Sequence, residues 1–275
     1  MTVKSINKSI EKFHKLSIQV SLNGLSFCIW DSIANSMLVS ESLIFQKELT
    51  PYGVQKELKA ICEKHNVVDN EFSDIIVIHR NNLFSLVPKS LFDENELANY
   101  LKFNTKILAN DHVVFDELEN FDMCNVYVPF VNINNYIFEL FGEFIYKHNT
   151  TVMVESLMNN HSGGNKTTCY AHITESQMEL TVISNKKLLL YNSYDYVTKE
   201  DFMYYLLFTL EQLKMDTEQV ALKLFGTIAK GDDLYNLCYQ YIKDVSLFTP
   251  TLSTYDFELD DSELETIDFT VLSSL

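Results

Sequence analysis

The chain has 275 residues, of which 47% are hydrophobic, and it carries a formal net charge of -17 at pH 7. A chain of this length and composition can bury a sizeable core in two lobes of domain size. Its acidity argues against nucleic acid or an anionic membrane surface as the main partner, because both attract clustered lysine and arginine.

The first lobe opens with a predicted β-hairpin over residues 16–30, in which apolar and polar residues alternate on both sides of a polar turn. A third strand is expected over 37–45. A helix over 51–66 then begins at Pro51, with Thr50 as its cap, because proline is best tolerated in the first helical turn. The same patterns predict the remaining elements of this lobe: strands over 74–79, 84–87, 112–115 and 125–131, and a helix over 94–104.

A long amphipathic segment follows over 134–147, and its apolar residues at helical spacing predict a helix that bridges the lobes. The second half of the chain then repeats the first. A shift that places Ile18 on Ala171 predicts a second hairpin over 169–183. The rest of this half follows in the same order: a strand over 188–191, a helix over 199–214, a strand over 221–225 and a helix over 232–243.

The order β-β-β-α-β-α-β is therefore predicted in both halves, which implies an α/β fold with two mixed sheets and helices on their faces. The expected division is a first lobe with its bridging helix over 1–147, a second lobe over 148–250 and an acidic tail over 251–275. The tail holds seven acidic residues and no lysine or arginine. It is expected to pair as an edge strand over 253–259 with 260–275 peripheral, or to dock into a partner protein.

The five cysteines are scattered without a CxxC pair, so we expect reduced thiols in the core and a cytoplasmic protein. The first residues are polar where a signal peptide would need an apolar run. No stretch approaches the roughly 18 apolar residues of a membrane span. The sequence therefore predicts a protein that is neither exported nor membrane-spanning.

Several partial motifs do not complete a catalytic or metal site. The segment 163–167, GGNKT, lacks the upstream glycine of a phosphate-binding loop and precedes a hairpin instead of a helix, so we interpret it as a linker. The seven histidines have no metal-ligand spacing and are interpreted as structural. The sequence contains no Gly-x-Ser-x-Gly elbow and no cysteine in an activating setting. We therefore predict no catalytic residue and no metal site.

The order β-β-β-α-β-α-β in both halves resembles the actin-like ATPase superfamily, a two-lobed fold of the ribonuclease H-like type. The segments most similar to an uncharacterised bacterial family with this fold are 198–213 (TKEDFMYYLLFTLEQL) and 222–242 (LKLFGTIAKGDDLYNLCYQYI). In active members of the superfamily, each hairpin turn carries an Asp-x-Gly type loop for phosphate and metal. A glycine pair after a late strand holds adenosine.

The corresponding turns of this chain are incomplete. The first turn keeps Gly24 beside Ser21 and Asn23 but has no acid, and the second has Glu175 but no glycine. The late strand ends at Gly226, a single glycine instead of two. A phosphate loop needs glycine for close backbone approach and a carboxylate for its metal. We therefore interpret Ser21, Asn23, Gly24 and Gly226 as remnants of nucleotide loops and expect no cofactor.

The resemblance and these departures predict a non-catalytic cytoplasmic scaffold or adaptor that binds an unidentified protein partner and no nucleic acid. The alternative is a nucleotide-dependent ATPase or phosphotransferase with an atypical site between the lobes, where ATP and magnesium would meet the remnant loops. Glu175 would be the one hairpin-turn acid of that site. A third interpretation is a sensor that binds a small molecule in the cleft without turnover.

Overall fold

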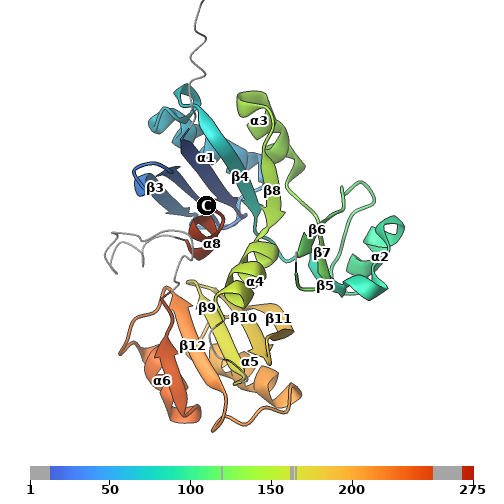
Figure 1. Ribbon diagram of the computed structural model, residues 1–275, viewed down its shortest axis with the longest axis vertical. Coiled ribbons are helices and arrows are strands. Elements are labelled where there is room, and N and C mark those ends of the chain that lie inside the picture. Colours follow the sequence, from blue (N-terminus) through green and yellow to red (C-terminus); the bar gives the residue numbers. More distant parts are fainter. Residues whose placement is uncertain (1–12, 119, 162–163, 165, 250–267) are drawn as a thin grey trace, which may run out of the picture.

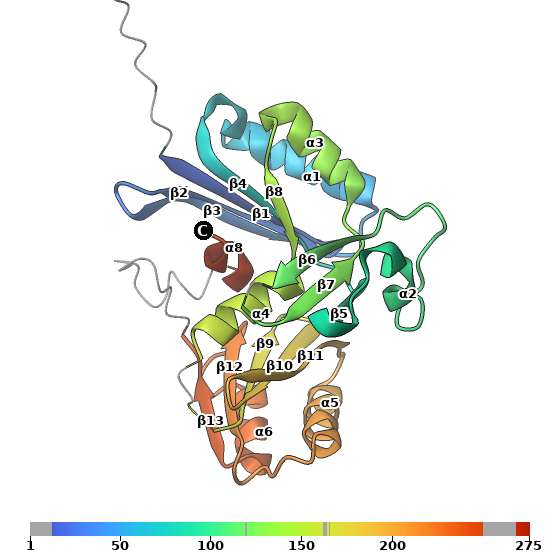
Figure 2. The same ribbon diagram turned by 45° about the vertical axis from the view of Figure 1, so that its right-hand side comes forward.

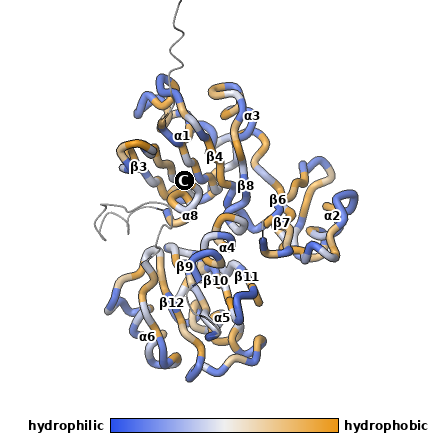
Figure 3. The backbone as a smooth tube through the Cα atoms, in the orientation of Figure 1, coloured by the Kyte–Doolittle hydropathy of each residue, from blue (hydrophilic) through white to orange (hydrophobic). Residues whose placement is uncertain are grey.

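The computed structural model describes residues 13–118, 120–161, 164, 166–249 and 268–275. Two lobes lie one above the other, each built on a five-stranded mixed sheet, and a small third sheet lies to one side of the first lobe (Figure 1). Hydrophobic segments run through the strands, whereas hydrophilic segments gather in outer loops beside α2, α3 and α6 (Figure 3). In the described part of the chain, no helix has the length and apolar character needed to cross a membrane.

The sheet of the first lobe has the strand order β3-β2-β1-β4-β8. Strand β1 pairs antiparallel with β2, where Ile18 lies opposite Phe27, and parallel with β4. Strand β8 extends the parallel part at the other edge. The five strands are β1 (His14–Val20), β2 (Gly24–Asp31), β3 (Ser36–Ile44), β4 (Phe72–His79) and β8 (Ile145–His148).

Helices α1 (Pro51–Lys64) and α3 (Val131–Phe141) lie side by side on the outer face of this sheet (Figure 2). Thr50 caps α1, because its Oγ1 accepts a hydrogen bond from the Gly53 backbone N–H at 3.2 Å. A short 3-10 turn, η1 (Val67–Asp69), leads from α1 into β4. The first core forms between the sheet and the apolar side chains of both helices: Val54, Leu58, Ile61, Ile133 and Ile137.

The sheet of the second lobe has the order β11-β10-β9-β12-β13, which matches the first sheet strand for strand. The predicted order β-β-β-α-β-α-β is therefore confirmed in both lobes. Helix α5 begins with a capping box, in which Thr198 and Asp201 each accept a hydrogen bond from the other's backbone N–H. The elements are β9 (Thr168–Ile173), β10 (Gln177–Ser184), β11 (Lys187–Asp195), α5 (Lys199–Gln212), β12 (Ala221–Gly226), α6 (Asp233–Tyr241) and β13 (Asp244–Leu247).

The two hairpins place matching residues in matching positions. Ile18 pairs with Phe27 in the first hairpin, and Ala171 pairs with Leu180 in the second. All four side chains are buried in the core of their own lobe. The alternation of apolar residues therefore predicted the inward face of both hairpins, and the structure adds their register. The five cysteines are buried and free, as the sequence predicted.

The third sheet is an insertion between β4 and α3, with the order β5-β7-β6. The sequence predicted its strands but not that they form a separate sheet. A small core of its own, around Val87, Leu101 and Val126, holds it together. The elements of the insertion are β5 (Phe84–Pro88), η2 (Lys89–Leu91), η3 (Glu94–Glu96), α2 (Leu97–Leu101), β6 (Val114–Leu118) and β7 (Met123–Tyr127).

The predicted bridging helix over 134–147 is wrong in its extent. Helix α3 ends at Phe141, because Gly142 takes a positive φ of 79°, a conformation that ends helices. The following residues form β8 instead, and the helix between the lobes is α4 (Asn149–Asn159) (Figures 1 and 2). Apolar residues at 144 and 145 continue the helical spacing by chance, which is why periodicity alone misplaced the helix end.

The C-terminal helix α8 (Phe269–Ser273) lies between the lobes and contacts α4, β1 and β2. Residues 269–272 are buried. The expectation that 260–275 is peripheral is therefore wrong for 268–275, whose apolar residues fill the space between the lobes. The strand expected over 253–259 lies outside the described residues.

Candidate functional site in the cleft between the lobes

The hairpin turns of the two lobes face each other across a cleft with a volume of about 970 Å³. The ends of β4 and β12 and the start of α8 complete its lining. The four residues that the sequence singled out, Ser21, Asn23, Gly24 and Gly226, all line this cleft, as does Glu175. The structure therefore brings together the residues that the sequence placed in one candidate site.

In both hairpin turns, a hydroxyl group forms a hydrogen bond within the turn itself. Ser21 donates its backbone N–H and its Oγ–H to the Gly24 carbonyl at 2.9 and 3.0 Å. Thr174 does the same to the Gln177 carbonyl at 2.9 and 3.1 Å. These donors hold each turn closed, so they are engaged where a phosphate-binding turn would need them free.

The two glycines are required by close backbone approach. A Cβ on Gly24 would lie 2.8 Å from the carbonyl oxygen of Leu43 on β3. A Cβ on Gly226, whose φ is +92°, would lie 2.2 Å from the carbonyl oxygen of Ile173 on β9. Strand pairing therefore accounts for both glycines, with no need for a bound anion.

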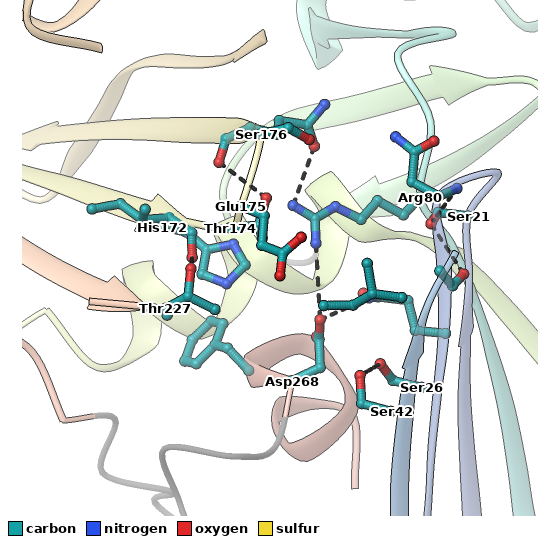
Figure 4. A pocket seen from close by; sticks show the side chains of 18 of the residues that line it. Ser21, Ser26, Ser42, Arg80, His172, Thr174, Glu175, Ser176, Thr227 and Asp268 are labelled. Atoms are coloured by element: carbon teal, nitrogen blue, oxygen red, sulfur yellow. Dashed lines mark hydrogen bonds and ion pairs between the residues drawn. The ribbon is translucent and has the colours of Figure 1, made fainter. Parts of the chain in front are cut away.

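Arg80, the only arginine of the chain, follows β4 and reaches across to the second lobe. Its Nη2 donates to Glu179 at 3.0 Å and to Gln177 at 3.2 Å. Its Nη1 lies 3.9 Å from Asp268, which precedes α8. Figure 4 shows Arg80 between the second-lobe turn and Asp268. The side chains of Arg80 and Glu179 are only 13% and 3% exposed, so the pair is shielded from water.

Glu179 on β10 is the acid at the centre of this network. Among the described residues, its carboxylate also accepts hydrogen bonds from Asn149 Nδ2 at 2.6 Å, His172 Nδ1 at 2.7 Å and the Tyr191 hydroxyl at 2.8 Å. Burial alone would raise the pKa of Glu179, but the Arg80 guanidinium and the His172 and Tyr191 hydrogen bonds lower it to about 2. Glu179 is therefore an ionised structural acid, and its oxygens are already engaged.

A second buried acid, Asp116 on β6, ties the small sheet to the start of α4. Its carboxylate accepts hydrogen bonds from Thr151 Oγ1 at 2.6 Å, the His148 N–H at 2.8 Å and the Tyr127 hydroxyl at 2.9 Å. Burial raises the pKa of Asp116 despite these donors. It does not line the cleft, so it serves packing and not a reaction there.

The charges of the cleft are unfavourable for a phosphate group. Its charged lining residues in the described part are two cations, Lys47 and Arg80, and four acids: Glu48, Glu175, Asp195 and Asp268. Arg80 is already paired with acids. Within that part of the chain, no group of three or more histidine, cysteine, aspartate or glutamate side chains could hold a metal ion. The acids of the lining would therefore repel the anionic phosphates of a nucleoside triphosphate more than the cations attract them.

A family model described as "Protein of unknown function (DUF3822)" matches residues 4–245. The chain belongs to this family. No curated protein matches the chain. A solved structure from Bacteroides thetaiotaomicron VPI-5482, described as a protein with actin-like ATPase fold and unknown function, has 24% identity and a TM-score of 0.75. That alignment covers 90% of this chain and 95% of the other.

A chain of a structure described as a PilM–PilN type IV pilus biogenesis complex has 11% identity and a TM-score of 0.62. It covers 95% of this chain and 97% of that chain. At these identities the likeness shows the fold alone. This member of the DUF3822 family therefore has the two-lobed actin-like fold that its strand order predicted.

Three residues of the interlobe network escaped sequence reasoning: Arg80, Glu179 and Asp268. Two signals were available. Arg80 is the only arginine, and Glu179 interrupts the apolar run MELTVI of a buried strand. A buried acid in such a strand calls for a cationic or donor partner, but the sequence does not say which residue provides it.

Proposed function

We propose that the protein is a non-catalytic cytoplasmic scaffold or adaptor whose actin-like body binds a protein partner. The Arg80–Glu179 ion pair carries this proposal. It links the two lobes through the protein's own charges, at the place where an actin-like ATPase would hold its nucleotide. The lobes therefore need no ligand to be held together.

The hairpin turns support the same conclusion. Their hydroxyl and backbone donors bond within each turn, and Gly24 and Gly226 serve strand packing. The acids around the cleft disfavour a triphosphate. Together these features support a body that keeps the fold without the phosphate chemistry.

One of the fold neighbours supports a partner-binding role by analogy. It is described as part of a PilM–PilN complex, so in that protein an actin-like fold belongs to a protein assembly. Such an analogy is associational, because one fold hosts many functions. It is consistent with an adaptor and does not by itself identify the partner.

An exposed aromatic pair on α5 provides a candidate surface for a protein partner. Tyr204 and Phe208 are 61% and 42% exposed, and their rings stack at 5.8 Å. Aromatic side chains of this kind are enriched at protein interfaces and often contribute most of the binding energy. The pair lies on the second lobe, on a helix that does not line the cleft.

The alternative is a nucleotide-dependent ATPase or phosphotransferase, with ATP and magnesium held by Ser21, Asn23, Gly24 and Gly226. The observation that favours it is the size of the cleft, about 970 Å³, which is in the range of small-molecule sites. A sensor that binds a small molecule without turnover would use the same space.

Two assays on the full chain separate these functions. The first measures magnesium-dependent phosphate release from ATP, and the second places a photo-crosslinking amino acid in the cell at Tyr204 or, as control, at Glu139 on α3. The adaptor function predicts no phosphate release and a crosslinked partner from position 204 only. Phosphate release that is lost in Glu175→Gln, or equal crosslinking from both positions, would overturn it.

A further inference from the structure

Residues 268–275 occupy a groove between the lobes as a peptide ligand would. The groove is formed by β1 and β2 of the first lobe, by α4, and by the end of β12 in the second lobe. Phe269 enters it edge-on to Phe225, with ring centroids 5.0 Å apart. Phe269, Val271 and Leu272 are buried, so the apolar side of the segment faces the protein.

Side chains on one face of β1 form hydrogen bonds with this segment. Alternate residues of a strand point to the same side, so the side chains at positions 15, 17 and 19 form a row. Each of them contacts the C-terminal segment: Lys15 Nζ donates to the Leu275 carbonyl at 2.8 Å, Ser17 Oγ shares a hydrogen bond with Ser274 Oγ at 2.7 Å, and Gln19 Nε2 donates to Asp268 at 2.8 Å.

Asp268 and Thr270 fix the beginning of the segment. Asp268 Oδ1 accepts the Thr270 N–H at 2.9 Å and so caps α8, while its Oδ2 faces Gln19 and Arg80. Thr270 Oγ1 also donates to Gln19. On the opposite side, Ser273 shares a hydrogen bond with Ser156 of α4 at 3.2 Å.

The contact between β1 and residues 268–275 combines buried hydrogen bonds with apolar packing, as a peptide-binding site does. Ser17 and Gln19 are buried polar residues on a strand face where apolar side chains would pack more readily. In the part of the chain that the structure describes, the hydrogen bonds of their side chains go to residues 268–275. These bonds offset the cost of removing the two polar side chains from water, so the groove favours a segment with a matching polar pattern. Residues 250–267 join the segment to the second lobe, and such a tether holds a ligand at high effective concentration.

We propose that this groove is a peptide-binding site, that residues 268–275 are its intramolecular ligand, and that a partner protein's segment of the same chemistry replaces them. That chemistry is an aspartate followed by one apolar helical turn. The proposal rests on the adaptor function and names its partner site. The partner's aspartate then takes the place of Asp268 beside Arg80, the residue that links the two lobes through Glu179.

The test cuts the chain after folding. A protease recognition sequence is inserted between Asp260 and Asp261 and cleaved, and a fluorescent synthetic peptide of residues 264–275 is added. Fluorescence anisotropy then follows its exchange into the groove. We expect saturable binding of the labelled peptide, which an excess of unlabelled peptide reverses. Asp268→Asn in the peptide, or Gln19→Leu in the protein, should weaken the affinity about tenfold or more.

Two controls make the result specific. A peptide with the sequence 268–275 scrambled should not bind, and Glu139→Gln, on an exposed part of α3, should bind as the unaltered protein does. Unfolding upon cleavage, lack of exchange, or equal binding of the scrambled peptide would each overturn the proposal. None of these results affects phosphate release or crosslinking at Tyr204, so the adaptor function is judged separately.

Discussion

Replacing Glu179 by glutamine tests whether the interlobe ion pair stabilises this protein. The change keeps the shape of the side chain but removes the charge that faces Arg80 at 3.0 Å. Removing one partner of a buried ion pair costs about 3–5 kcal/mol. The pKa of Glu179, about 2 against an ordinary 4.5, corresponds to about 3 kcal/mol. Glu179→Gln should therefore lower the free energy of unfolding at pH 7 by about 3 kcal/mol.

Urea denaturation of the purified chain measures this change through the midpoint and slope of the transition. The matched control is Glu175→Gln, an exposed acid on the neighbouring turn, which should change stability by about 0.5 kcal/mol or less. Arg80→Met and the double variant complete a mutant cycle. Because the two residues share one contact, the double variant should lose clearly less stability than the two single variants added together.

The pH dependence gives an independent check. The pKa of Glu179 is below its ordinary value in the folded protein, so its contribution is fully present above about pH 4.5 and is lost as the pH falls towards about 2. Glu179→Gln should lack this part of the acid sensitivity. If Glu179→Gln and Glu175→Gln are equally stable, or if the cycle is additive, the ion pair does not hold the lobes together.

Three further substitutions or deletions follow from the packing. Phe27→Ala should cost about 3–5 kcal/mol in urea denaturation, because Phe27 is buried in the first core; a change below about 1 kcal/mol would contradict its placement. Gly226→Ala should lower Tm and the soluble yield, because a Cβ would lie 2.2 Å from the Ile173 carbonyl oxygen; an unchanged Tm would refute this close approach. Deleting residues 268–275 should lower Tm by about 5 °C or more, and the synthetic peptide should restore it; an unchanged Tm would mean that the buried helix α8 adds no stability.

Sequence patterns predicted the features that depend on residues close together in the chain, such as hairpins and helix starts. The alternation of apolar and polar residues predicted both hairpins and their inward faces, and Ile18 and Phe27 are indeed buried in the first core. The cap Thr50 and the following Pro51 marked the start of α1. The order of these elements along the chain predicted a two-lobed fold with mixed sheets, and the structure has two such sheets with matching strand orders.

The interlobe contacts could not be predicted in this way, because they join residues far apart in the chain. Arg80 and Glu179 are 99 positions apart, and Gln19 and Asp268 are 249 apart. No periodicity connects such residues. The acids at the end of the chain suggested a solvated tail, whereas the apolar residues among them place 269–272 in the interior. Composition alone does not distinguish these two outcomes.

We propose that this actin-like cleft is held by the protein's own charges and not by a nucleotide. Isothermal titration calorimetry of the full chain with ATP and magnesium measures whether a nucleotide binds there. We expect no saturable heat at millimolar ATP, in the unaltered protein and in Glu175→Gln alike. A dissociation constant in the micromolar range or tighter, weakened in Glu175→Gln, would contradict it and establish the cleft as a nucleotide site.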